Sequence, residues 1–198
     1  MMMHSLIFAT NNPNKVHEIR SVLVDSFEII TLKEAGINID IPEPHNTLEK
    51  NAREKSSVIN KLTGKNCFSE DTGLEVPALN GEPGVKSARY AGDNVDFKNN
   101  IKKLLDNLKN VQNKAAQFRT VISLILNNKE YQFEGICKGR IVDVEKGNNG
   151  FGYDAVFIPD GSTKTFAEMD MPEKNIFSHR KKATAKLIDF LNSYNGKD

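Results

Sequence analysis

The sequence predicts a mixed α/β fold, and three patterns support that prediction. The chain opens with an apolar run, a helical repeat and a second apolar run, an order that is typical of a βαβ unit. Amphipathic helical patterns recur later, between further strand-like runs. Two of those runs flank Asn127 and Asn128, which indicates a long β-hairpin. The 198 residues are enough for a real core in one domain or two closely joined lobes.

The first half of the chain predicts three strands and two helices. Short apolar runs predict the strands, which are expected at 5–9, at 27–32 and from 67 onward. A helix over 15–24 is predicted by apolar residues that fall on one face, namely Val16, Ile19, Val22 and Leu23. Asn46 followed by Glu49 resembles a capping box, so a second helix is expected from about 47 to 62.

The second half alternates in the same way. An amphipathic helix is predicted over 97–108, and Ser178 is suited to cap a last helix that runs to about 194. Strands are predicted at 118–126, 130–141 and 155–158. Stretches rich in Gly, Asn and Pro predict loops, at 80–84 and 147–154.

Composition narrows the class of protein. Lys and Arg number 27 against 26 Asp and Glu, and this net charge of +1 gives no support for nucleic-acid binding. The two cysteines, Cys67 and Cys137, form no zinc or disulfide pattern and suit a reducing, cytoplasmic compartment. No apolar run is long enough for a signal-peptide core or a membrane span, so no membrane partner is expected.

Residues 10–15, Thr-Asn-Asn-Pro-Asn-Lys, lie between the first predicted strand and helix. Backbone N–H groups at a helix N-terminus attract anions. Thr10 and Asn11 add neutral donors, and Lys15 adds a charge suited to phosphate. The loop lacks the glycine spacing of a Walker loop. It indicates a phosphate site, and the alternative is an ordinary turn with a solvated lysine.

A group of acids follows the strand that begins at 67. Glu70, Asp71 and Glu75 are expected to lie close together where that strand stops, and like charges that close raise one another's proton affinity. A divalent cation relieves the repulsion, and Mg²⁺ prefers carboxylates together with substrate phosphates. Glu43 is a further candidate because the prolines on either side stiffen its backbone. The alternative is that these acids are exposed surface residues.

Two later segments carry residues suited to binding a nucleotide base. Gly152 permits close approach of a flat ligand, and the rings of Phe151 and Tyr153 are suited to stack on a base. His179 and Arg180 offer donors for a carbonyl edge. The alternatives are aromatic residues of the core and, for Arg180, a solvated helix face.

The order of five motifs resembles that of the inosine triphosphate pyrophosphatases, the Ham1-like family. The motifs are Phe-Ala-Thr-Asn-Asn-x-x-Lys (8–15), Ser-Glu-Asp-Thr-Gly-Leu-Glu-Val (69–76), Gly-x-Pro-Gly-Val-x-Ser-Ala-Arg-Tyr-Ala-Gly (81–92), Gly-Phe-Gly-Tyr-Asp (150–154) and Lys-Asn-x-x-Ser-His-Arg (174–180). Each motif is weak alone, but five in this order are specific, and the resemblance runs from Leu6 to Leu191.

The resemblance implies an elongated mixed β-sheet with flanking helices and two lobes around a central substrate cleft, in one domain over 1–198. It implies a Mg²⁺-dependent hydrolase that cleaves ITP, dITP and XTP to the monophosphate and pyrophosphate, which removes deaminated purines from the nucleotide pool. A cytoplasmic homodimer is expected, with a nucleoside triphosphate as its small-molecule partner and with neither nucleic acid nor membrane.

The resemblance also implies roles for single residues. Asp71 is the catalytic residue, as general base or as metal ligand, and Glu43 is a second metal-linked carboxylate. The residues implied in substrate binding are Thr10, Asn11, Asn12, Lys15, Thr72, Phe151, Gly152, Tyr153, Asp154, Lys174, His179 and Arg180. Donors from His179 or Arg180 are expected to read the acceptor at position 6 of hypoxanthine or xanthine, where adenine carries an amino group.

The chain departs from the family at a few positions. Lys50 stands where the family's helix signature has an acid, while Asn51 and Lys55 keep their places. Glu49 is not given a metal role, because a shift of one residue turns the side chain by about 100° around a helix. Two rival functions are a Maf-like pyrophosphatase, whose phosphate loop reads Ser-x-Ser-Pro-Arg-Arg, and a non-catalytic nucleotide sensor on the same scaffold.

Overall fold

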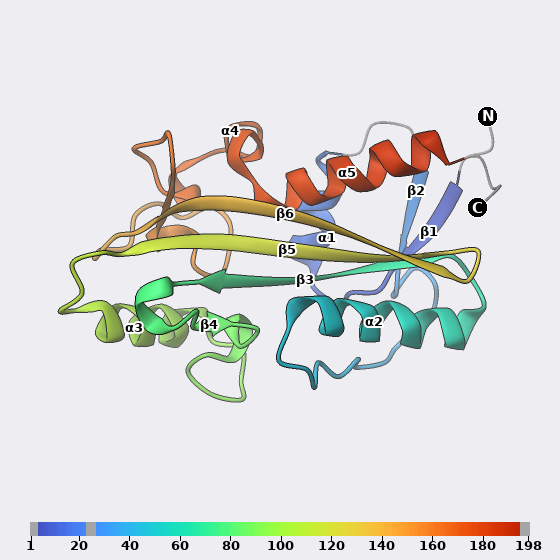
Figure 1. The fold of residues 1–198 in the computed structure, drawn as a ribbon, viewed down its shortest axis with the longest axis horizontal. Helices are drawn as coiled ribbons and strands as arrows, with labels where there is room; N and C mark the ends of the chain where they lie inside the picture. Colours follow the sequence, from blue (N-terminus) through green and yellow to red (C-terminus); the bar gives the residue numbers. More distant parts are fainter. Residues whose placement is uncertain (1–3, 23–26, 195–198) are drawn as a thin grey trace. The chain divides into compact units, whose positions relative to one another are not determined.

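The structure is a computed structural model that describes residues 4–22 and 27–194, so Leu23 and Val24 of the first predicted helix lie outside the described residues. Within those ranges the chain forms seven strands and five α-helices, and the mixed α/β fold is confirmed (Figure 1). The strands are β1 (His4–Phe8), β2 (Phe27–Thr31), β3 (Cys67–Glu75), β4 (Pro83–Gly84), β5 (Ala115–Leu126), β6 (Lys129–Ile141) and β7 (Phe157–Pro159). The helices are α1 (Pro13–Arg20), α2 (Leu48–Thr63), α3 (Phe97–Leu108), α4 (Met171–Phe177) and α5 (His179–Ser193).

The described strands form one mixed sheet in the order β2-β1-β3-β5-β6-β7, with β4 paired to β3. Strand β1 is parallel to both β2 and β3, so β1, α1 and β2 form the predicted βαβ unit. The predicted hairpin is also confirmed. Asn127 and Asn128 have φ angles of 51° and 64°, and two such residues are what a tight turn between antiparallel strands requires.

Two helices begin at residues other than those predicted. Helix α1 starts at Pro13, because the Asn12 side chain accepts the backbone N–H groups of Asn14 and Lys15 at 2.9 and 3.4 Å. The predicted cap of α2 at Asn46 is wrong, since Thr47 accepts the Lys50 N–H at 3.3 Å and acts as the N-cap.

Two differences concern the last third of the chain. Strand β7 is shorter than predicted, because residues 154–156 form a turn of 3₁₀-helix. Sequence reasoning missed α4, a seven-residue helix whose N-cap Asp170 accepts the Glu173 N–H at 2.8 Å. Helix α5 begins directly after Ser178, as predicted.

The chain divides into two compact units, and β3, β5 and β6 each contribute to both. Unit 1 comprises Met1–Asp71, Thr120–Gly135 and Arg180–Asp198. Unit 2 comprises Thr72–Arg119 and Ile136–His179. The expected substrate cleft between two lobes stays a prediction.

In unit 1 the strand side chains alternate between two faces of the sheet, because successive residues of a strand point in opposite directions. Leu6 and Phe68 share a core cluster with Leu187 of α5. Ile7, the neighbour of Leu6, belongs to a second cluster with Ile59 of α2. Helices α5 and α2 therefore cover opposite faces of these strands (Figure 1).

Unit 2 has a core of its own. Phe118 of β5 and Phe157 of β7 belong to one buried cluster with Leu104 of α3 and with Tyr153. Phe118 meets Phe157 edge to face at 4.7 Å between ring centroids, a favoured geometry for aromatic pairs.

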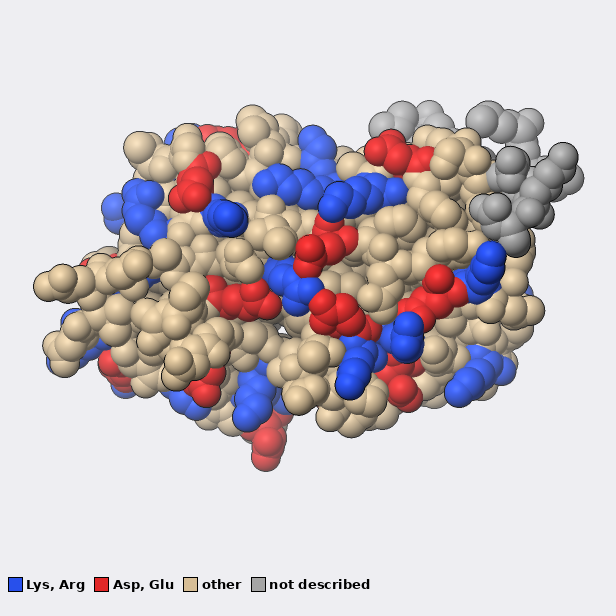
Figure 2. Space-filling model, in the orientation of Figure 1, with Lys and Arg blue, Asp and Glu red and all other residues tan. Residues whose placement is uncertain are grey.

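Two further observations concern the charge of the surface and the length of the helices. Figure 2 shows positive and negative side chains interspersed over the visible face, in keeping with the net charge of +1. Among the described residues, no helix is both long enough and apolar enough to cross a membrane.

Candidate functional site

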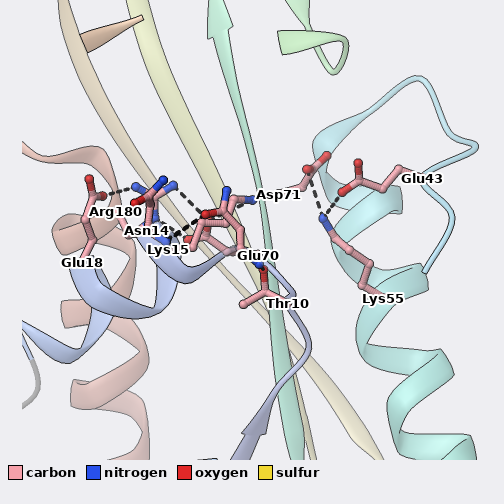
Figure 3. Close-up of polar contacts among 10 residues, drawn as sticks. Thr10, Asn14, Lys15, Glu18, Glu43, Lys55, Glu70, Asp71 and Arg180 are labelled. Atoms are coloured by element: carbon pink, nitrogen blue, oxygen red, sulfur yellow. Dashed lines mark hydrogen bonds and ion pairs between the residues drawn. The ribbon is translucent and has the colours of Figure 1, made fainter. Parts of the chain in front are cut away.

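The neighbouring acids Glu70 and Asp71 lie within β3 and point to opposite faces of it. The prediction that the strand stops at these acids is wrong, because β3 continues to Glu75. Strand alternation places Glu70 on the face of Phe68, toward α5, and Asp71 on the face of Cys67, toward α2. Figure 3 shows the two carboxylates pointing apart, toward different basic residues. The expected joint cluster of repelling carboxylates is therefore not formed.

Glu70 lies in a buried ion-pair network with balanced charge. Its two oxygens accept hydrogen bonds from Arg180, from Nε at 2.7 Å and from Nη2 at 3.0 Å. Lys15 Nζ lies 3.1 Å from Glu70 Oε1, and Arg180 Nη1 also binds Glu18 (Figure 3). Only 1% of Glu70 and 2% of Arg180 are exposed. Two cations thus neutralise two carboxylates in unit 1, which connects α1, β3 and α5.

The basic partners control the ionisation of Glu70. Burial alone would raise the pKa of this carboxyl, because a charge is poorly solvated in the interior. Arg180 and Lys15 outweigh burial and lower the pKa of Glu70 to about 2. Glu70 is therefore ionised at every physiological pH.

Asp71 lies in a second network, in which negative charge is in excess. Lys55 Nζ donates to Asp71 Oδ1 at 3.2 Å and also to Glu43, so one ammonium serves two carboxylates (Figure 3). Asp71 Oδ2 is buried and has no hydrogen-bond partner among the described residues. A buried oxygen in that state is costly, so the site is suited to a further cation or donor.

The surroundings of Asp71 also change its acidity. Burial raises the pKa of Asp71 above its ordinary value and Glu43 adds to the rise, while Lys55 and Lys15 oppose it. Burial lowers the pKa of Lys55, but Asp71 and Glu43 outweigh burial, so the pKa of Lys55 is raised overall. The lysine stays charged beside an aspartate that holds its proton more tightly than usual.

The loop 10–15 is fixed by its own side chains. Thr10 Oγ1 accepts the Asn12 N–H at 3.1 Å, and Asn12 caps α1. Asn11 Nδ2 donates to the Ile39 carbonyl at 2.9 Å, which ties the loop to the segment that follows β2. Thr10, Asn11 and Asn12 line a groove of about 1130 Å³ in unit 1, together with α1 and that segment.

In unit 2, the predicted base-binding residues form a second group. Asp154 Oδ2 accepts the Phe151 N–H at 2.9 Å and the Lys174 ammonium at 2.6 Å. The same ammonium lies 5.6 Å from the centroid of the Phe151 ring, within range of a cation–π interaction. Gly152 has a φ of +64°, and a side chain there would meet no atom within 4 Å. The loop is thus held by Asp154 while the space over Gly152 stays open.

His179 and Tyr153 are both buried in unit 2. The His179 ring stacks on Phe118 with a centroid distance of 4.7 Å and an interplanar angle of 13°. The Tyr153 hydroxyl donates to the Ser87 carbonyl at 2.9 Å. Tyr153 is therefore a core aromatic, the alternative recognised in the sequence, and its contact with a substrate stays a prediction.

The structure brings the predicted residues together in two sets. Unit 1 joins Lys15, Glu43, Asp71 and Arg180 through the two networks, and unit 2 joins Phe151, Asp154 and Lys174. Thr72 follows Asp71 on β3 and is half-buried. Glu75 lies apart from Glu70, pairing in unit 2 with Gln117 at 2.7 Å and Arg119 at 3.6 Å. In the structure Arg180 pairs with Glu70 and Glu18. Its expected contact with the base stays a prediction.

Sequence reasoning assigned no role to Lys55 or Glu18. A signal for Lys55 was available, because it lies on the face of α2 that also carries the apolar residues Ala52 and Ile59. A lysine in a buried stripe is uncommon unless it is paired. No comparable signal marks Glu18, whose partner Arg180 lies 162 residues away.

The chain is similar to known proteins over nearly its whole length. It is 50% identical over 186 residues to the dITP/XTP pyrophosphatase of Flavobacterium psychrophilum, covering 94% of this chain and 98% of that protein. The structure of the Staphylococcus aureus Ham1 protein matches with a TM-score of 0.86 at 39% identity, covering 95% and 98% of the two chains. A HAM1 protein from Coxiella burnetii matches with a TM-score of 0.89 at 34% identity, covering 97% and 100%.

The model of the Ham1 family matches residues 6–190, which is most of the sequence. The match includes all the motifs on which the resemblance rests, from Thr10 in the first loop to Arg180 at the start of α5. Together with the relatives, it shows that this chain belongs to the Ham1 family.

Proposed function

We propose that this protein is a nucleoside triphosphate pyrophosphohydrolase that cleaves ITP, dITP and XTP to the monophosphate and pyrophosphate. The observation that carries the proposal is the pairing of two carboxylates, Glu43 and the buried Asp71, on the buried ammonium of Lys55, in the same unit as the loop 10–15. The similarity to a dITP/XTP pyrophosphatase supports the choice of substrates. The cellular role would be removal of deaminated purines from the nucleotide pool, by one domain over 1–198 that forms a cytoplasmic homodimer.

The residues around Asp71 fit a Mg²⁺ ion. Glu43 and Asp71 share one ammonium, and Asp71 Oδ2 is buried without a hydrogen-bond partner in the described chain. Mg²⁺ is usually held by one or two carboxylates together with substrate phosphates and water, so two acids suffice. Glu43 and Asp71 would hold the ion, which would neutralise charge on the phosphates.

The chain's own groups would bind the triphosphate and manage the proton. Lys15 and the backbone N–H groups at the start of α1 would hold the phosphates in line for attack on the α-phosphorus. Water forms the new bond to phosphorus as the bond to the bridging oxygen breaks and pyrophosphate leaves. Asp71 has two roles open to it, accepting the proton of the water or holding the metal.

The base would be read in unit 2. His179 is the stronger candidate for a donor to position 6 of the base, because the Arg180 guanidinium is engaged by Glu70 and Glu18. Phe151 offers a half-buried ring for stacking beside the open space over Gly152. A donor facing the amino group of adenine would leave two buried groups unpaired, which is the physical basis expected for rejecting ATP.

The test is pyrophosphate release from ITP, XTP, GTP, ATP and a pyrimidine triphosphate, each with Mg²⁺ and with EDTA. We expect metal-dependent turnover of ITP and XTP at least about 100-fold above ATP, the ratio that a few kcal/mol of discrimination provides. Preferred turnover of pyrimidine nucleotides would favour the Maf-like function. Binding of ITP without turnover would favour the nucleotide sensor.

A further inference from the structure

We propose that Asn51 is a positioning residue for Glu43, holding the backbone two residues beyond that carboxylate. The inference rests on the proposed function, because it concerns the place of a carboxylate that would hold the metal. The sequence motifs do not indicate a role for Asn51. Its hydrogen bonds in unit 1 indicate one.

Asn51 clasps a single residue of the preceding loop. Its Oδ1 accepts the His45 N–H at 2.9 Å, and its Nδ2 donates to the His45 carbonyl at 3.1 Å. Asn51 is 1% exposed, so its amide is shielded from water at its end of both bonds. A buried amide that satisfies both backbone groups of one residue fixes the position of that residue as a strand partner would.

The clasped residue follows a segment that has no helix or strand of its own. Residues 37–44 have irregular structure and contain Glu43 between two prolines. Asn11 holds the earlier part of the segment through the Ile39 carbonyl at 2.9 Å. Glu43 is thus bracketed by two asparagine contacts. The prolines between them limit the conformations available to its backbone.

Helix α2 sets the distance between the clasp and the ion pair. Asn51 and Lys55 are four residues apart on one buried face of α2, and such residues lie one above the other. Asn51 binds the backbone at His45, and Lys55 binds the side chain of Glu43. Because both contacts come from one helix, the carboxylate is held relative to Lys55 and Asp71.

A weaker contact also reaches His45. Its ring lies 3.6 Å from Glu54, but both side chains are more than a third exposed, and exposed pairs contribute little. The backbone clasp by Asn51 is therefore the contact expected to matter.

The experiment compares Asn51→Ala and Asn51→Leu with Asn60→Ala. Leucine keeps the volume of the side chain and removes both hydrogen bonds, so it guards against a cavity effect. Asn60 lies on the same helix and donates to the Lys65 carbonyl at 3.0 Å, so its variant loses a similar bond away from Glu43. The two measurements are Mn²⁺ binding, from the electron paramagnetic resonance signal of the free ion, and hydrogen exchange at the His45 amide.

We expect both Asn51 variants to bind Mn²⁺ about 10-fold more weakly, the low end of the effect of residues that orient metal ligands. The His45 amide should exchange at least about 10-fold faster, and Asn60→Ala should match the wild-type protein in both measurements. Unchanged Mn²⁺ affinity in the Asn51 variants overturns the inference, whatever the exchange rate, as does a wild-type protein that binds no Mn²⁺. If the wild-type protein binds Mn²⁺ but does not hydrolyse ITP, the proposed function is refuted. The Mn²⁺ affinities of the Asn51 variants then still decide whether Asn51 positions Glu43.

Discussion

Glu70 and Asp71 are neighbours on β3, yet their carboxylates have different surroundings. Glu70 faces two cations, Arg180 and Lys15, and burial leaves it 1% exposed. Asp71 shares the ammonium of Lys55 with Glu43 and keeps one buried oxygen without a hydrogen bond in the described chain. On one face each carboxylate contacts a cation of its own network, and on the other two carboxylates share one ammonium.

The difference shows how a strand separates structure from chemistry. Alternation sends consecutive residues to opposite faces, so two neighbouring acids contact different basic partners. On the Glu70 face, the carboxylate cross-links α1, β3 and α5. On the Asp71 face, the missing charge is what a metal ion or a substrate would supply. A substitution at Glu70 and one at Asp71 therefore test the two faces separately.

The largest effect is expected for Asp71→Asn. Turnover of ITP should fall by about 10²–10⁴-fold, the contribution of a group that moves a proton at the reacting centre. The free energy of unfolding should stay the same or rise, because the change removes a charge that burial disfavours. Enzyme assays check the expected loss of turnover, and urea denaturation checks the free energy of unfolding. Near wild-type activity would exclude Asp71 from the reaction.

The next effect is expected for Glu70→Gln, and it is on stability. Removing one partner of a buried ion pair typically costs about 3–5 kcal/mol, and here Arg180 would lose the charge of Glu70. Urea denaturation measures the loss. Asp106→Asn is the control, because its i,i+4 pair with Lys102 is exposed and should contribute less than about 0.5 kcal/mol. Equal losses in the two variants would contradict the assigned role of the Glu70 network.

Smaller effects are expected on how the free energy of unfolding changes with pH, and they have opposite signs for Glu70 and Asp71. The pKa of Glu70 is lowered from 4.5 to about 2 in the folded protein, so its contribution to stability is full above pH 4.5 and is lost as pH falls toward 2. The pKa of Asp71 is raised above 3.8, so its protonation favours the folded state as pH falls. The free energy of unfolding should therefore fall less steeply on acidification in Glu70→Gln than in the wild-type protein. In Asp71→Asn it should fall more steeply.

Urea denaturation at a series of pH values between 7 and the acid limit tests these signs. Subtracting the wild-type curve removes the contributions that the other carboxylates share. The same slope for both variants would show that the two carboxylates titrate alike, against the comparison of the two faces.

Much of the fold followed from local patterns in the sequence. The helix over 97–108 and the hairpin around Asn127 and Asn128 were predicted because apolar spacing and turn residues act over short distances. Helix α4 was missed because seven residues are too few to show a helical period. The predicted stop of β3 at Glu70 and Asp71 was wrong because the apolar run ends there, whereas buried cations accompany both acids and let the strand continue.

The candidate site was predictable only in part. Motif order pointed to Lys15 and Asp71, the resemblance implied Glu43, and strand alternation alone was enough to separate Glu70 from Asp71. The partner of Glu70 was not predictable, because Arg180 lies 110 residues away and only the packing of α5 brings the two together. The clasp by Asn51 was hidden for a different reason, since its contacts are with backbone atoms, which carry no sequence signal.

Lys55 acts as a counter-ion that belongs to the chain itself. Its ammonium lies between Glu43 and Asp71, where it tempers the repulsion of two carboxylates before any other cation arrives. The two acids are therefore compensated within the folded chain, unlike the ligands of small domains that fold only around a bound ion. Under the proposed function, a metal ion would join two acids that this lysine already holds in place.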